Sequence, residues 1–140
     1  MQHEPVPFTE IERILPILNK MSIFGGLQDK HLYTVFQALE RVSYKKDEVI
    51  FKEGDSPSNI YIIIEGVVTM VLNYDETPLE MVEFSVGNCI GETSLIGIQR
   101  HTATAVADTD VELLVLSRSA LMSFFADDKE LFSYIILNIA

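Results

Sequence analysis

The sequence contains little cysteine and little positive charge. Its one cysteine, Cys89, cannot form an internal disulfide, so nothing indicates an oxidising compartment. Ten Lys and Arg residues stand against 21 Asp and Glu residues, which gives a formal net charge of −11. A nucleic-acid surface needs clustered Lys and Arg to displace phosphate counterions. We therefore expect no nucleic-acid contact by these residues.

Long apolar runs and targeting signals are also missing. No apolar run approaches the roughly 20 residues that a membrane-spanning helix needs, and residues 1–5 lack the charged-then-apolar pattern of a signal peptide. We expect a cytoplasmic domain. Apolar residues make up 48 % of the chain, which is enough for a packed core and excludes a disordered chain. A length of 140 residues fits one domain.

Enzyme signatures are absent as well. The sequence has no phosphate-loop Gly-Lys-Ser/Thr pattern, no Gly-x-Ser-x-Gly elbow and no His-Glu-x-x-His zinc motif. His3, His31 and His101 are scattered, without carboxylates at ligand spacing, so they do not supply the histidine-rich metal set of a jelly-roll enzyme. We predict a protein that is not an enzyme, with no catalytic residue, no metal site and no cofactor.

Helical patterns flank a long β-rich region. Thr9 and Glu12 form a capping-box pattern before a periodic segment that contains Pro16, and a second helix fits Asp29 to Leu39. From Val42 to about Leu116, short strands alternate with turns about every 8–12 residues, which is typical of a sandwich or barrel. The expected strands include 49–51, 60–71 with a break at 65–66, 79–86, 102–107 and 111–116.

The C-terminal part returns to helix. Ser119 is a candidate cap for a helix through Phe125, and residues 129–140 are apolar almost all round a final helix. Such a helix must be buried on several sides. We predict that it meets a partner or continues in a longer chain; the alternative is full docking on its own barrel.

One segment has the chemistry of an anion site. Gly91-Glu92 follows a strand and opens a short apolar turn, and Arg100 and His101 come eight and nine residues after Glu92. A helix N-terminus offers unpaired N–H groups to a phosphate, glycine allows close approach, and a carboxylate accepts hydrogen bonds from sugar hydroxyls. The alternative is that these residues bind nothing: Gly91 is a plain turn glycine and Glu92 is a first-turn acid favoured by the helix dipole. Arg100 and His101 are then solvated loop residues.

Two spaced motifs resemble the cyclic-nucleotide-binding domain family, which includes catabolite activator proteins and protein-kinase regulatory subunits. The likeness spans about Phe24 to Ala140 and rests on the patterns Gly54-Asp55-x₄-Ile60-Tyr61-x-Ile63-x₂-Gly66-x-Val68 and Gly87-x₂-Ile90-Gly91-Glu92-x₂-Leu95-Ile96. The resemblance implies a mainly β fold with flanking helices, namely an eight-stranded jelly-roll barrel. It implies three parts: an N-terminal helical segment (1–22), the nucleotide-binding domain (23–128) and the start of a C-terminal lid or dimerisation helix (129–140).

The same resemblance implies roles for the residues of the segment. Residues 91–103 would form a phosphate-binding cassette for cAMP or cGMP, with Glu92 on the ribose 2′-hydroxyl. The N–H groups of Thr93 and Ser94 would bind the cyclic phosphate, and Ile90 would line the pocket. It also implies a sensor whose output comes from movement of the C-terminal helix, with a homodimer or a downstream output domain as partner.

The sequence departs from the family at the phosphate arginine. Aligned through residues 102–105, Thr102-Ala103 match the family, but Arg100-His101 stand where Pro-Arg is usual. The cation is therefore either replaced by His101 or shifted to Arg100. Thr102 is the residue that, in cGMP-responsive members, reaches the guanine amino group. The alternative function is a degenerate barrel that binds another protein and no nucleotide.

Overall fold

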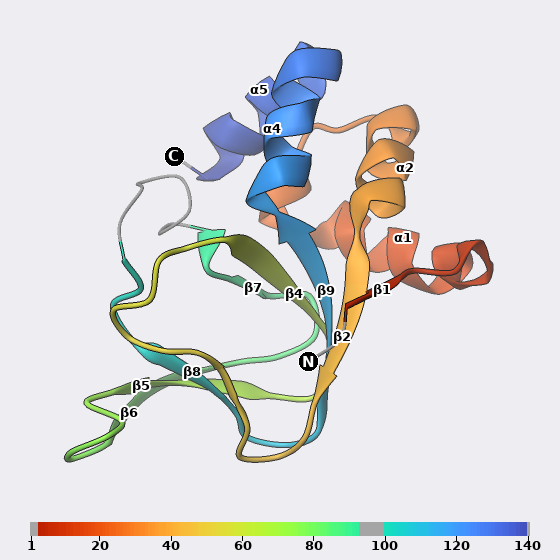
Figure 1. The fold of residues 1–140 in the computed structure, drawn as a ribbon. Helices are drawn as coiled ribbons and strands as arrows, with labels where there is room; N and C mark the ends of the chain where they lie inside the picture. The colour runs from red at the N-terminus through yellow and green to blue at the C-terminus, as the bar shows by residue number, and fades with distance from the viewer. Residues whose placement is uncertain (1–2, 93–99, 140) are drawn as a thin grey trace.

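Two antiparallel sheets form the β part of this computed structural model, which describes residues 3–92 and 100–139 (Figure 1). The five-stranded sheet has the order β1 (Glu4–Pro5), β2 (Glu40–Tyr44), β9 (Val111–Ser117), β4 (Asn59–Glu65) and β7 (Cys89–Ile90). The four-stranded sheet has the order β3 (Val49–Phe51), β8 (Thr104–Ala107), β5 (Val68–Leu72) and β6 (Leu79–Phe84). The mainly β architecture is confirmed, and the described strands pair as two separate sheets rather than as one closed barrel.

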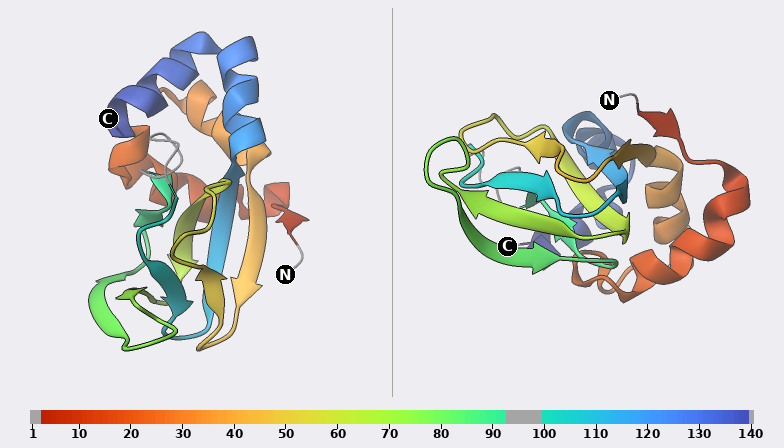
Figure 2. Two further views of the ribbon diagram at one scale, coloured as in Figure 1. Left: turned by 60° about the vertical axis from the view of Figure 1, so that its left-hand side comes forward. Right: turned by 90° about the horizontal axis from the view of Figure 1, so that it is seen from below.

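Four α-helices lie in the described residues: α1 (Ile11–Lys20), α2 (Asp29–Ala38), α4 (Arg118–Asp127) and α5 (Lys129–Ile139). They gather on one side of the five-stranded sheet, and the four-stranded sheet lies on the other (Figures 1 and 2). Among the helices described, none is long and apolar enough to span a membrane.

Strand β4 explains why residues 60–64 are apolar without a break. Successive side chains of a strand point to opposite faces. Ile60, Ile62 and Ile64 pack against the helices, while Tyr61 and Ile63 pack into the core between the two sheets. Both faces of the strand are therefore buried, and a polar side chain on either face would need a hydrogen-bond partner.

The helix ends differ from the predicted caps. Thr9 lies inside a 3₁₀ turn (Phe8–Glu10), and α1 begins at Ile11 without any side-chain cap, so the predicted capping box is wrong. The helix α4 begins at Arg118, and its cap is Ser117, whose hydroxyl accepts from the N–H of Ala120 at 3.1 Å, rather than the predicted Ser119.

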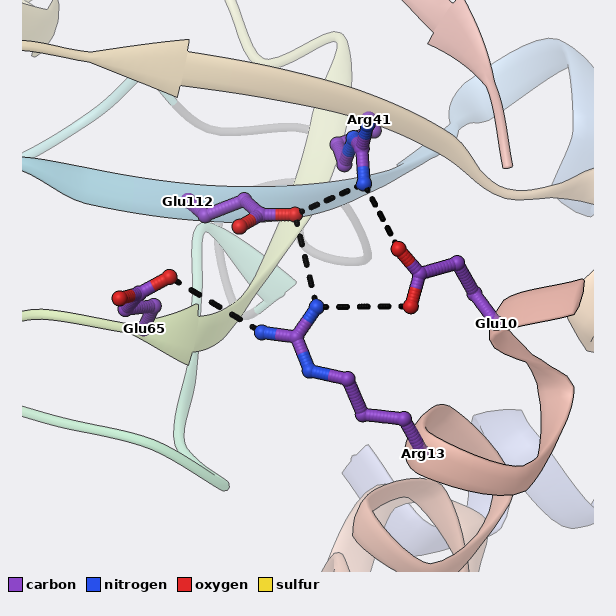
Figure 3. A network of polar contacts seen from close by, with 5 residues as sticks. All are labelled: Glu10, Arg13, Arg41, Glu65 and Glu112. Atoms are coloured by element: carbon purple, nitrogen blue, oxygen red, sulfur yellow. Dashed lines mark hydrogen bonds and ion pairs between the residues drawn. The ribbon is translucent and has the colours of Figure 1, made fainter. Parts of the chain in front are cut away.

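A polar network links Glu10, which lies just before α1, to the five-stranded sheet (Figure 3). Its carboxylate accepts from Nη1 of Arg41 on β2 at 3.1 Å and lies 3.6 Å from Nη1 of Arg13 on α1. Both arginines also approach Oε1 of Glu112 on β9, at 3.1 Å and 3.8 Å, and Arg13 lies 3.9 Å from Glu65. The network joins the N-terminal helical segment to the five-stranded sheet, so Glu10 serves a contact 31 residues away in sequence.

The final helix docks on the other helices. In α5, Leu131 and Ile135 are fully buried, and the side-chain amide of Asn138 donates to the carbonyls of Ile23 at 3.0 Å and Gly25 at 2.8 Å. Its other face includes Leu137, which is 72 % exposed. The helix is thus half buried within this chain, and a partner for its exposed face stays a prediction.

Candidate functional site

A cavity of about 220 Å³ lies beside the end of β7 and contains most of the predicted site. Its wall is formed by Phe51, Met70, Met81, Val82, Phe84, Cys89, Ile90, Gly91, Glu92, His101, Thr102 and Ala103. Six predicted residues, Ile90, Gly91, Glu92, His101, Thr102 and Ala103, therefore meet around one space. Thr93 and Ser94 lie outside the described residues. The predicted Arg100 has its side chain bound elsewhere.

Gly91 makes the turn that carries the chain from β7 to Glu92. Its φ is +89°, which side chains rarely tolerate, and a Cβ there would lie 2.9 Å from the carbonyl oxygen of Asn59. The same Cβ would lie 3.6 Å from Cε1 of His101, so the backbone of Gly91 is close to that ring. Only glycine fits this conformation and this approach together.

Glu92 is half-buried at the cavity wall, and its Oε2 is a buried atom without a hydrogen-bond partner among the described residues. Burial of an unpaired carboxylate oxygen is unfavourable, so this atom is an acceptor available to a donor from a ligand. Cys89 lies next to it. Burial, the charge of Glu92 and a hydrogen bond with the Glu92 side chain together raise the pKa of the Cys89 thiol to about 12.

His101 is buried against the cavity, and its ring stacks on Phe51 with 3.8 Å between the centroids. Its backbone N–H donates to the carbonyl of Asp55 at 3.0 Å, and its carbonyl accepts from the N–H of Gly54 at 2.8 Å. Burial lowers the pKa of His101, and the charge of Asp55 acts more weakly in the opposite direction. The imidazole is therefore neutral at pH 7.

Arg100 has a different environment. Its guanidinium is exposed, donates from Nη1 to the carbonyl of Gly54 at 2.9 Å and lies 3.4 Å from the hydroxyl of Ser56. The Arg100 side chain therefore bonds to the turn formed by residues 52–58, whereas the neighbouring His101 lines the cavity. Of the two residues that the sequence offers for the phosphate contact, His101 is the one that lines the cavity with Gly91 and Glu92.

Sequence reasoning missed the opposite wall of the cavity. Phe51, Met70, Met81, Val82 and Phe84 come from β3, β5 and β6 of the four-stranded sheet. Met70 pairs with Val82 across the β5–β6 ladder, and a register shift between Met70 and Val71 gives β6 one extra residue there. Nothing in local spacing identifies these residues as site residues, because their part in the cavity depends on pairing between strands.

A larger cavity, of about 410 Å³, is less suited to an anion. It is lined by Ser43, Tyr44, Lys45, Glu48, Glu65, Asp110, Val111 and Glu112, so four carboxyl groups face a single lysine. Such a wall repels a phosphate. Within residues 3–92 and 100–139, no three His, Cys, Asp or Glu residues are grouped so that they could hold a metal ion.

Comparison with known proteins places this geometry in a family. The family model "Cyclic nucleotide-binding domain" matches residues 41–128. The chain is 34 % identical over 110 residues to the cAMP-dependent protein kinase regulatory subunit of Candida albicans, covering 79 % of this chain and 23 % of that protein. It is 29 % identical over 117 residues to the same subunit of Dictyostelium discoideum, covering 83 % and 36 %. The chain thus spans about a third or less of these relatives.

Solved structures agree on the fold. A cyclic nucleotide-binding domain from Methylobacillus flagellatus superposes with a TM-score of 0.84 at 24 % identity, covering 99 % of this chain and 78 % of that one. The family model covers more than half of the sequence, including the strands and turns that build the cavity. This chain therefore belongs to the cyclic nucleotide-binding domain family.

Proposed function

We propose that the cavity binds a 3′,5′-cyclic nucleotide and that the chain is a regulatory sensor. The observation that supports this most is the convergence of Gly91-Glu92 with His101-Thr102-Ala103 on one space. An unpaired carboxylate oxygen for a ribose hydroxyl and a titratable imidazole for a phosphate then lie in one wall. The two curated relatives are kinase regulatory subunits, which supports a binding rather than a catalytic role and requires no cofactor.

Each part of the ligand has a proposed contact. Glu92 accepts from the ribose 2′-hydroxyl, His101 donates to the cyclic phosphate, and the N–H groups of Thr93 and Ser94 complete the phosphate site. Ile90, with the apolar side chains of β5 and β6, packs against the rest of the nucleotide. Without a guanidinium in the wall, the phosphate loses a charge-assisted bidentate contact, so binding is expected to be about 10- to 100-fold weaker than with arginine.

The base of the proposed ligand is adenine if the ligand is cAMP and guanine if it is cGMP. The names of the curated relatives include cAMP, which supports cAMP. Thr102 lines the cavity and supports cGMP, because its hydroxyl is a hydrogen-bond partner for the guanine amino group. The chain thus carries one argument for each ligand.

Binding is proposed to act through the C-terminal helix. The proposed parts are the N-terminal helical segment 1–22, the binding domain 23–128, whose two sheets would make an eight-stranded jelly roll, and the helix 129–140. Because α5 packs on the segment around Ile23 through Asn138, a nucleotide that favours one position of α5 would signal to a homodimer partner or an output domain. The proposed location is the cytoplasm.

Isothermal titration tests the proposal directly. Titrating the chain with cAMP and with cGMP at pH 6 and at pH 8 should give saturable heat for at least one nucleotide, with the larger affinity at pH 6. AMP and GMP serve as non-cyclic controls. No heat for either cyclic nucleotide up to millimolar concentration would reject nucleotide sensing.

The second candidate is a protein-binding module that no longer takes nucleotide. The exposed position of Arg100 favours it, because the described cavity wall then holds neither arginine nor lysine. The unpaired Glu92 oxygen favours the nucleotide. Size-exclusion chromatography separates the two: a dimer whose mass and stability are unchanged by cAMP and cGMP supports the protein-binding module.

A further inference from the structure

Cys89 lies beside Glu92, the carboxylate proposed to bind the ribose, and position 89 is one that the family motif leaves unspecified. It lies in β7, where it pairs with Ile62 of β4, and Glu92 follows three residues later. Both side chains line the nucleotide cavity, and both also border a smaller space beside Ser22 and Ile23. The thiol and the carboxylate therefore occupy one short stretch of wall, held at its N-terminal end by pairing with β4.

The two side chains interact. Burial is the largest cause that raises the pKa of Cys89 to about 12, followed by the charge of Glu92 and a hydrogen bond with its side chain. Cys89 is consequently a protonated thiol at neutral pH, and a thiol can donate to a carboxylate. Within residues 3–92 and 100–139, the Oε2 atom of Glu92 is buried and has no hydrogen-bond partner. That oxygen can accept a hydrogen bond from a further donor.

We propose that Cys89 is a positioning residue: its S–H donates to the Glu92 carboxylate and holds the other carboxylate oxygen toward the ribose 2′-hydroxyl of the nucleotide. This role rests on the proposed function. A 3′,5′-cyclic nucleotide keeps one free ribose hydroxyl, so the orientation of a single carboxylate oxygen decides that contact. Cys89 does not touch the ligand hydroxyl itself; it fixes the rotamer of the group that does.

The contact between the two side chains can be tested without nucleotide. Because Cys89 is the only cysteine in the sequence, the rate of alkylation by iodoacetamide at pH 8.5 reports this thiol alone. In Glu92→Gln the negative charge is removed while the shape is kept, so the thiol pKa falls and alkylation should become at least about 3-fold faster. Glu83→Gln, on the exposed strand β6, is the matched control. Equal rates in the wild type and Glu92→Gln would overturn the contact.

The positioning role is tested with cAMP and 2′-deoxy-cAMP. The wild type should prefer cAMP by about 10-fold, since a hydrogen bond to a charged group is lost in the deoxy compound. Cys89→Ala should reduce that preference to about 3-fold or less, while 2′-deoxy-cAMP affinity changes little. Cys89→Ser, which keeps a hydrogen-bond donor of similar size, should retain the wild-type preference for cAMP over 2′-deoxy-cAMP. Melting curves check that both variants are folded.

The outcomes separate the two proposals. An unchanged cAMP preference in folded Cys89→Ala overturns the positioning role and leaves nucleotide binding standing. If the wild type binds neither compound, nucleotide binding fails and the positioning role fails with it. In that case the alkylation rates still decide whether the thiol and carboxylate are in contact.

Discussion

The imidazole of His101 lies nearly parallel to the ring of Phe51, with centroids 3.8 Å apart and 16° between the planes. Phe51 also stacks on Tyr61 at 6.0 Å, so the ring of His101 is fixed against the core between the sheets. Asp55 is the charged neighbour that acts on His101, and Cys89 and Glu92 are the titratable groups that share its cavity. Among the described lining residues, His101 alone can become positively charged.

We predict that cyclic-nucleotide affinity rises as pH falls. Burial holds the pKa of free His101 below 6.5, and a bound phosphate favours the imidazolium and raises that pKa in the complex. Affinity should therefore be low and constant above the pKa of the complex, rise as pH falls through it, and level off below the pKa of the free protein. Titrations between pH 5.5 and pH 8 measure this, with His101→Gln as the control. The same pH profile in His101→Gln would contradict the assignment.

Exchanging the cation should change affinity strongly at one position and weakly at its neighbour. His101→Arg places a permanently charged guanidinium in the cavity wall, so nucleotide affinity should increase about 10- to 100-fold and lose its pH dependence. Arg100→Ala removes the bonds to the Gly54 carbonyl and the Ser56 hydroxyl, which lie outside the cavity wall, and affinity should change by less than about 3-fold. If Arg100→Ala abolished binding and His101→Gln did not, the phosphate contact would belong to Arg100.

Local patterns predicted the parts of the site that local chemistry determines. The strand at residues 60–64, the break near Glu65 and the turn at Gly91-Glu92 all follow from short stretches of sequence. Which of Arg100 and His101 faces the cavity does not follow from local sequence. Strand β8 begins only at Thr104, so the alternation of side chains along a strand does not extend back to these two residues. Their orientations come from the bonds of residues 100–101 to the 54–56 turn.

Contacts distant in sequence account for the other differences. The predicted box of Thr9 and Glu12 did not form because Thr9 lies inside a 3₁₀ turn and α1 begins only at Ile11, next to Glu10, which bonds to Arg41. The far wall of the cavity depends on the pairing of Met70 with Val82. Neither pair is encoded by spacing within one element. The likeness to the family predicted the fold and named His101 and Arg100 as candidates for the phosphate contact. That His101 lines the cavity, and that Cys89 lies beside Glu92, is seen only from their surroundings in space.

Replacing Gly91 with alanine should be more costly than the same change at Gly87. Both glycines have a φ near +90°, at +89° and +90°, so the backbone strain of about 1–3 kcal/mol is shared. A Cβ at Gly91 also meets the carbonyl oxygen of Asn59 at 2.9 Å, whereas a Cβ at Gly87 has nothing within 4 Å. Urea unfolding should show Gly91→Ala to be less stable than Gly87→Ala by about 1 kcal/mol or more. Equal losses would mean that the β4–β7 pair moves apart without cost.

Replacing Thr102 with alanine should change the preference between the two nucleotides. Thr102 is exposed at the cavity rim, so removal of its hydroxyl leaves the fold intact. If guanine is the base it contacts, cGMP affinity should fall about 3- to 10-fold while cAMP affinity stays the same. Thr102→Ser, which keeps the hydroxyl, is the control. A parallel loss for both nucleotides would exclude a role of Thr102 in choosing the base.

The attachment of α5 depends on Asn138, whose side-chain amide donates to two carbonyls of the Ile23–Gly25 segment. Asn138→Ala removes both bonds from a partly exposed site, so the local opening of the last turn of α5 should become easier by about 1–2 kcal/mol. Hydrogen exchange of the amides in residues 135–139 should accelerate about 5- to 30-fold, while global stability changes less. Leu137→Ala, at a side chain that is 72 % exposed, should leave exchange unchanged. If nucleotide binding slows exchange in the wild type but not in Asn138→Ala, α5 is coupled to the cavity through this contact; equal slowing in both would place the coupling elsewhere.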